Sequence, residues 1–239
     1  MMTGDFFLDI EAQAHQDLLK FYEPYFSDTI ETEQFINMIY SYDYDNRKPR
    51  QMLYQVERFV SLATNIDKIK PARDGLRILF IKTCMEALFF LSKSTSKPLF
   101  FSELAKCFNE EGKAYILTHF QLTGFEQEIN GVKYIEKYDL CIEDILQLIK
   151  AIRDKVVHEG IYWETQLFAY DKDSEWLSSI RTRERILSRY QYKEKNEEIE
   201  YSFCTTLQFD AFIHYFVSAC IEFILRYVNK LDTKERADC

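Results

Sequence analysis

The sequence predicts an all-α protein, an up-down bundle of about five to six helices with one or two small β-hairpin insertions. The first observation is that 239 residues include only 6 Gly and 4 Pro, against about 17 and 12 at average usage. So few turn formers argue against sandwiches, barrels and Gly-rich dinucleotide folds. The second is that long stretches repeat apolar residues at helical spacing. With 47% hydrophobic residues, of which many are aromatic, the chain can bury a substantial core.

Six stretches carry the helical pattern, and the prolines fall where one pattern ends or another begins. The predicted helices cover residues 7–21, 50–65, 72–93, 102–119, 142–159 and 209–231. Ser102 is the expected N-cap of the fourth helix, because a serine hydroxyl accepts from the first free N–H groups. The third helix is apolar around most of its circumference, which is typical of a helix at the centre of a bundle.

Two stretches favour β-hairpins instead. Residues 127–138 contain Asn130-Gly131 between apolar flanks, which is the turn chemistry of a tight hairpin. Residues 186–206 alternate around a charged turn and predict a second hairpin. The Tyr- and Asp-rich segment at 41–49 is expected to be a loop.

The expected organisation is an N-terminal helical extension (1–71) packed on the core, a helical bundle (72–231) and a C-terminal tail (232–239). The N-terminus lacks the features of a signal peptide, and no run of about 18 uncharged apolar residues occurs. Six single cysteines and four dispersed histidines form no closely spaced pairs, which argues against a structural zinc site. We therefore expect a cytoplasmic protein with reduced thiols, no membrane segment, no metal and no cofactor.

The net charge of −9 excludes a protein that coats DNA, since such binding depends on phosphate neutralisation. The charge is uneven, however, because residues 181–195 hold six basic and two acidic side chains. Tyrosines interleaved with these cations could stack on bases. The candidate RNA-binding residues are Lys155, Arg181, Arg183, Arg185, Arg189 and Tyr190. A solvated hairpin without a nucleic-acid role explains the same segment equally well.

The helix at 142–159 carries the most informative residues. Its predicted buried arc consists of Ile145, Leu148, Ile149, Ile152 and Val156. At 100° per residue, Arg153 falls inside this arc. A guanidinium cannot lose its charge, so it needs an anion or must border a cleft. Asp154 and His158 are four residues apart and share the polar side, where a carboxylate can orient an imidazole.

The segment from Arg153 through Asp154 to His158, with four residues between Arg and His, resembles the motif of the HEPN superfamily of all-α domains. The resemblance covers about residues 72–231 and leaves the N-terminal extension and the hairpins outside the common core. It implies a metal-independent endoribonuclease of the toxin or phage-defence kind, acting on RNA as a homodimer with a composite active site. An antitoxin protein is a possible further partner.

The resemblance implies catalytic roles for Arg153, Asp154 and His158. An imidazole such as that of His158 can take the 2′-OH proton or protonate the leaving oxygen. Arg153 could hold the scissile phosphate, with a 2′,3′-cyclic phosphate as product. Asp154 would orient His158 or contact the substrate.

Two other interpretations stay open. One is a HEPN-like module that dimerises or binds nucleotides or RNA without cleaving them. The other is an unrelated helical interaction protein, in which Arg153 pairs with an acid such as Glu86 and His158 is a polar residue at a helix end.

Overall fold

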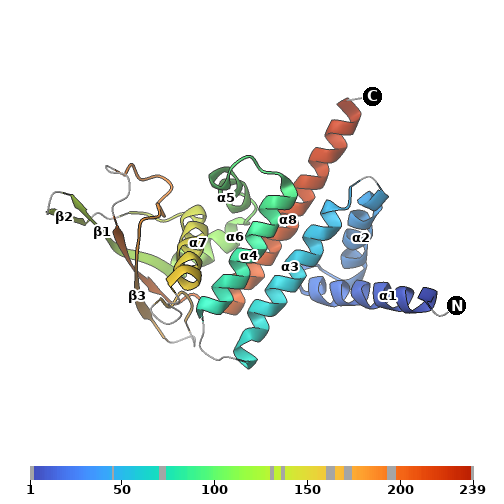
Figure 1. Ribbon diagram of the computed structural model, residues 1–239, viewed down its shortest axis with the longest axis horizontal. Helices are drawn as coiled ribbons and strands as arrows, with labels where there is room; N and C mark the ends of the chain where they lie inside the picture. Colours follow the sequence, from blue (N-terminus) through green and yellow to red (C-terminus); the bar gives the residue numbers. More distant parts are fainter. Residues whose placement is uncertain are drawn as a thin grey trace.

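The computed structural model describes residues 3–44, 46–69, 74–129, 132–135, 138–159, 165–169, 174–192 and 198–237 (Figure 1). These ranges are mostly helical, as the sequence predicts, but they contain eight α-helices rather than five or six. The helices are α1 (Thr3–Tyr22), α2 (Thr29–Tyr40), α3 (Lys48–Asn65), α4 (Asp74–Ser92), α5 (Lys97–Ala105), α6 (Glu110–His119), α7 (Ile142–Glu159) and α8 (Phe209–Ala237). Short 3₁₀ helices cover Glu23–Tyr25, Ser41–Tyr44 and Ile66–Lys68.

The helix predicted at 102–119 is two helices, and Ser102 is not an N-cap. Its place is inside α5, which Ser96 caps by accepting from the N–H of Leu99 at 3.4 Å. Asn109 caps α6 by accepting from the N–H of Gly112 at 2.7 Å. A serine or asparagine with an extended backbone accepts a hydrogen bond from a free N–H group in the first turn of the helix that follows it. A new helix therefore begins after Ser96 and another after Asn109, although the apolar spacing continues from one to the next.

The strands form one antiparallel sheet in the order β2-β1-β4-β3. They are β1 (Phe120–Ile129), β2 (Val132–Ile135), β3 (Trp176–Thr182) and β4 (Ile199–Thr205). The first predicted hairpin is the β1–β2 pair, whose Asn130-Gly131 turn lies outside the described residues.

The second predicted hairpin is wrong. Residues 186–192 form no strand, and β4 pairs instead with β3, which precedes it by more than 15 residues, and with β1. Alternation of apolar residues predicts a strand but says nothing about which partner it pairs with.

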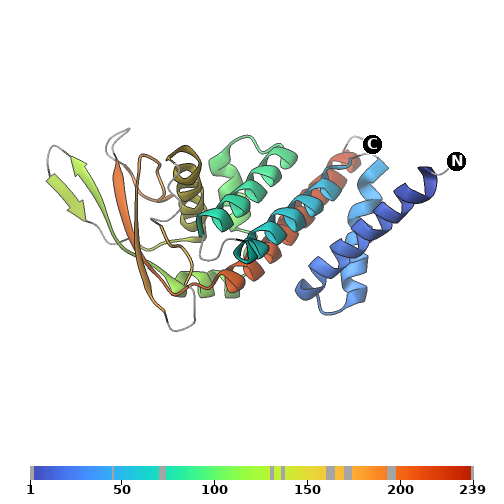
Figure 2. The same cartoon turned by 60° about the horizontal axis from the view of Figure 1, so that its bottom comes forward.

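The long helices α3, α4 and α8 run side by side, with α1 and α2 at one end and α7 and the sheet at the other (Figures 1 and 2). A single hydrophobic cluster continues from α1 to α8 and includes Val56, Met85, Ile149 and Phe216, all buried. The predicted boundary at residue 71 lies outside the described residues. The described part of the predicted C-terminal tail continues α8 to Ala237.

Within the described residues, α8 is the one helix long and apolar enough to cross a membrane, over Phe209–Thr233. However, 56% of that window is buried inside the protein. The central helix of a bundle has the same length and composition.

Two buried aspartates fix the segments that surround α7. Oδ2 of Asp74, at the start of α4, accepts from the backbone N–H groups of Leu167 at 3.0 Å and Phe168 at 2.8 Å. Asp144 in the first turn of α7 accepts from the N–H of Cys141 at 2.8 Å and from that of Ser188 at 2.6 Å. These contacts hold the chain after α7 against α4, and the chain after β3 against the beginning of α7.

Candidate functional site

The helix α7 has the buried arc that the sequence predicts. Ile145, Leu148, Ile149, Ile152 and Val156 are each less than 5% exposed. The Arg153 side chain is 21% exposed, which fits its place on the inner arc where α7 packs on α4. The sequence thus correctly predicts a partly buried guanidinium that needs an anion.

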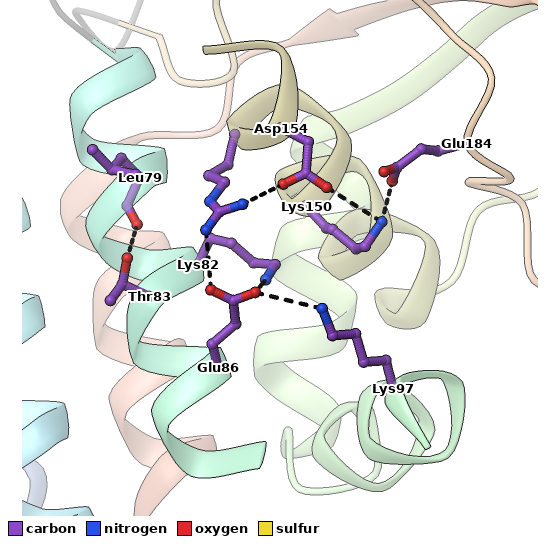
Figure 3. A network of polar contacts seen from close by, with 9 residues as sticks. Leu79, Lys82, Thr83, Glu86, Lys97, Lys150, Asp154 and Glu184 are labelled. Atoms are coloured by element: carbon purple, nitrogen blue, oxygen red, sulfur yellow. Dashed lines mark hydrogen bonds and ion pairs between the residues drawn. The ribbon is translucent and has the colours of Figure 1, made fainter. Parts of the chain in front are cut away.

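The anion is Glu86 of α4, which binds three cations (Figure 3). One carboxylate oxygen lies 3.2 Å from Nη2 of Arg153. The other lies 2.6 Å from Nζ of Lys82 and 3.6 Å from Nζ of Lys97. Lys82 is itself buried, with 1% of its side chain exposed, so Glu86 neutralises a charge that water cannot solvate.

Asp154 extends this network away from α4. Its Oδ1 lies 2.6 Å from Nη1 of Arg153, and its Oδ2 lies 3.4 Å from Nζ of Lys150. Lys150 also pairs with Glu184, in the segment after β3. We call these seven residues the ion network, and it joins α4, α5, α7 and the segment after β3 (Figure 3). Its members are Lys82, Glu86, Lys97, Lys150, Arg153, Asp154 and Glu184.

The ion network changes the proton affinities around Glu86. Burial would raise the pKa of Glu86, but the hydrogen bond and charge of Lys82, followed by the charges of Arg153 and Lys97, lower it below its ordinary value. Burial lowers the pKa of Lys82, and Glu86 opposes that effect. Glu86 is therefore held as a carboxylate at neutral pH.

The two outer carboxyl groups differ from each other. Burial tends to raise the pKa of Asp154, but hydrogen bonds from Arg153 and Glu184 and the charge of Lys150 lower it overall. Burial raises the pKa of Glu184, and the neighbouring Asp154 adds to this against the effect of Lys150. Where the two share a proton, Glu184 is therefore the group that holds it.

His158 lies outside this network. It is exposed in the last turn of α7, and no described residue forms a hydrogen bond or ion pair with it. Both oxygens of Asp154 contact cations, Arg153 and Lys150, rather than the imidazole. Five positions correspond to about 140° around a helix, so Arg153 and His158 leave α7 in different directions. The structure brings Arg153 and Asp154 together but not His158.

The candidate RNA-binding residues are divided between paired and exposed side chains. Arg181 lies 2.6 Å from Glu200, and Arg183 lies 3.9 Å from Glu198. Arg185 lies over the ring of Tyr192, 5.0 Å from its centroid. Part of the positive charge of this segment is therefore neutralised locally.

The other three candidate RNA-binding residues, Arg189, Lys155 and Tyr190, differ in how far their side chains are exposed. Arg189 is exposed, whereas Lys155 on α7 is half-buried. Tyr190 is also half-buried, and its ring packs edge-on against Phe125 with centroids 4.9 Å apart. A tyrosine packed in this way supports the local fold rather than offering a face for a base.

Sequence reasoning missed four members of the ion network, namely Lys82, Lys97, Lys150 and Glu184. The Lys82–Glu86 spacing of four on an apolar helix is a detectable signal, because such residues share one face. Glu184 and Lys97 give no comparable signal, since each reaches the network from an element distant in sequence. Within the described ranges, no group of three His, Cys, Asp or Glu side chains could hold a metal ion.

Comparison with known proteins identifies no relative of this chain. No family model matches the chain, and neither the curated proteins nor the solved structures contain a significant match.

Proposed function

We propose that this protein is a metal-independent endoribonuclease that cleaves RNA with Arg153 and His158 and acts as a homodimer. The observation that carries the proposal is the arrangement on α7. A partly buried Arg153, fixed by Glu86 and Asp154, is followed after four residues by His158, which is exposed and has no polar partner among the described residues. A positioned cation and an accessible imidazole are the two groups that RNA cleavage without a metal requires.

The chemistry assigns a separate task to each side chain. The neutral imidazole of His158 takes the proton of a ribose 2′-OH, and the 2′-oxygen attacks the adjacent phosphorus. The bond from phosphorus to the 5′-oxygen breaks, and the 5′-oxygen takes up a proton from solvent and leaves as a 5′-hydroxyl end. The protonated His158 returns its proton to solvent, and the other product is a 2′,3′-cyclic phosphate. Arg153 has five N–H donors, of which two engage carboxylates, so it keeps donors for a phosphate oxygen. Asp154 and Glu86 position that guanidinium.

The direction of the two side chains argues for a dimer. Because Arg153 and His158 point about 140° apart, one chain does not present both to the same phosphate. A two-fold axis beside α7 would place His158 of one copy opposite Arg153 of the other. Exposed apolar residues flank this region, namely Val157 at 48% and Phe90, one turn beyond Glu86, at 69%.

The second candidate is a HEPN-like module that dimerises or binds nucleotides or RNA without cleaving them. The ion pairs of Arg153 with Glu86 and Asp154 favour a helical protein without catalysis, whether HEPN-like or unrelated, since a guanidinium with two carboxylates is already neutralised. A role as a toxin or in phage defence, with or without an antitoxin partner, requires RNA cleavage. Such a role therefore belongs to the nuclease proposal and not to the non-catalytic module.

Cleavage of a labelled RNA in the presence of EDTA tests the nuclease. We expect the wild type to leave 2′,3′-cyclic phosphate ends, and His158→Ala to lower the rate at least about 100-fold. The matched control is His214→Ala, an exposed histidine on α8, which should keep the wild-type rate. His158→Ala should also change the unfolding free energy by less than about 0.5 kcal/mol, because the side chain has no described polar partner.

Mixing variants tests the composite site. Arg153→Ala and His158→Ala are each inactive in a homodimer, but their mixed dimer keeps one site with both residues. An equal mixture should recover about a quarter of the wild-type rate by random pairing. Equal cleavage by the wild type and both variants would assign the activity to another site. No cleavage of any RNA by the wild type would favour the non-catalytic module.

A further inference from the structure

A second charged region lies in a pocket between helices. A pocket of about 850 Å³ lies between the start of α3, the end of α4, α5 and the C-terminal half of α8. None of its lining residues belongs to the ion network. Its volume is within the range of small-molecule sites.

The cations of this pocket greatly outnumber its acids. The basic lining residues are Lys48, Lys93, Lys106, Arg226 and Lys230. The acidic lining residue is Glu103, which lies 3.5 Å from Lys230. Arg226 is paired to Glu222 outside the pocket, at 2.7 Å. The charge of Lys106 interacts with the carboxyl group of Glu143 and lowers its pKa against the larger effect of burial. Among the described residues, no carboxylate forms an ion pair with Lys48 or Lys93. The pocket therefore has an excess of positive charge that an anion would neutralise.

Two of these lysines lie directly beside each other. The pKa of Lys48 is lowered, first by burial and then by the charge and contact of the Lys93 ammonium group. Lys93 follows the end of α4 with a φ of 54°, a left-handed conformation that costs a non-glycine residue about 1 kcal/mol. A left-handed residue directly after a helix is a common way for the helix to end. Two adjacent ammonium groups repel each other unless a multivalent anion lies between them.

Backbone and hydroxyl groups add to this positive end of the pocket. Lys48 is the first residue of α3, whose first turn has no acidic residue. Its N–H donates to Oδ1 of Asn46 at 3.1 Å, so a neutral side chain and not a carboxylate caps the positive end of the helix dipole there. Oγ of Ser94, another lining residue, is buried and has no hydrogen-bond partner in the part of the chain that the structure describes. A buried hydroxyl without a partner suggests that a ligand supplies one.

The other wall of the pocket is apolar and partly aromatic. It includes Leu99, Phe223, Tyr227 and Leu231. Leu99 is 46% exposed, which is high for a leucine, whereas Phe223 is buried. The ligand therefore needs a flat or apolar group at one end and several negative charges at the other.

We propose that this pocket binds a nucleoside polyphosphate, with the phosphates at Lys48, Lys93 and Ser94 and the base against Leu99 and Tyr227. The proposal is independent of the nuclease, since the two regions share no residue.

Isothermal titration calorimetry at 150 mM NaCl tests it on the full chain. The probes are the four nucleoside triphosphates, inorganic triphosphate and adenosine. We expect saturable binding of at least one nucleoside triphosphate with one site per chain. Inorganic triphosphate should bind at least about tenfold more weakly, because it does not contact the apolar wall.

The variants remove each end of the ligand site separately. Lys48→Gln and Lys93→Gly should each weaken nucleotide binding about tenfold, the usual loss for one charge-assisted contact. Lys93→Gly is safe for the fold because glycine adopts a positive φ without strain. Tyr227→Leu should weaken nucleotide binding but not triphosphate binding. The control is Lys20→Gln, an exposed lysine of α1 outside the pocket, which should bind as the wild type does.

Three results would overturn the assignment. One is the absence of saturable binding for every nucleotide, and another is equal affinity for triphosphate and nucleotide. The third is binding that Lys48→Gln and Lys93→Gly leave unchanged, since it would then occur elsewhere. Loss of RNA cleavage by His158→Ala has no bearing on these outcomes.

Discussion

The ion network and the pocket are both rich in lysine and arginine, but they differ in how that charge is balanced. In the ion network four cations meet three carboxylates. Glu86 and Asp154 each contact more than one of the cations, and Glu184 contacts Lys150. In the pocket five cations meet one acidic lining residue. A balanced cluster is able to hold helices together, whereas an unbalanced one is prepared for an anion from outside.

The ion network also makes it harder for Arg153 to bind the RNA phosphate in the proposed nuclease. A phosphate that binds Arg153 has to compete with Glu86 and Asp154, so the same contacts that position the guanidinium oppose its use. Charge balance thus separates a scaffold from a binding site more clearly than the number of cations does.

The largest effect should come from removing the central carboxylate of the ion network. Glu86→Ala removes the carboxylate that pairs with the buried Lys82 and leaves Arg153 with Asp154 alone, so it should cost about 3 kcal/mol of unfolding free energy. The measurement is urea unfolding followed by circular dichroism.

The matched substitution is Glu103→Ala, which removes the acidic residue of the pocket. It should cost less than about 1 kcal/mol, because its partner Lys230 is 68% exposed. Comparable losses in the two variants would contradict the distinction between the regions.

A smaller effect should appear on acidification. The pKa of Glu86 is lowered in the folded protein, so its carboxylate stabilises the fold above the ordinary glutamate pKa of about 4.3. That contribution is lost as the pH falls further, through the folded pKa.

Urea unfolding of the wild type and Glu86→Gln at several pH values measures this contribution. The stability difference between them should be constant from pH 7 to about pH 5 and shrink below that range. The altered pKa values of Asp154 and Glu184 are present in both proteins, so their effects largely cancel. A difference that does not change with pH would show that the charge of Glu86 is unimportant.

The smallest effect should be a gain in stability at the pocket. Lys93→Gly relieves the strain of a left-handed lysine and separates Lys48 from a like charge, so stability should rise by up to about 1 kcal/mol. Thermal unfolding would show a raised Tm. A fall in Tm would mean that Lys93 makes stabilising contacts, and the pocket would then resemble the ion network.

The motif helix shows what could be predicted from local sequence. Its apolar spacing gave the buried arc, the place of Arg153 on it and the need for an acid, because all of these depend on residues within one helix. The pairing of Asp154 with Lys150 rather than His158 was not predicted, since a carboxylate between two neighbours on a helix selects the better-placed charge. The single helix predicted at 102–119 was wrong because capping by Ser96 and Asn109 outweighs a continuous apolar pattern.

By itself the sequence determined a mostly helical protein, because scarce glycine and proline and an apolar period near 3.6 residues act locally. Only the tertiary structure decided that β4 pairs with β3 and β1, and that Glu86, Arg153 and Glu184 meet across three elements. It also decided that Lys48, at the start of α3, and Lys93, just after α4, lie side by side in one pocket. These contacts join residues far apart in the chain, so they depend on how the helices pack and not on the pattern within any one of them.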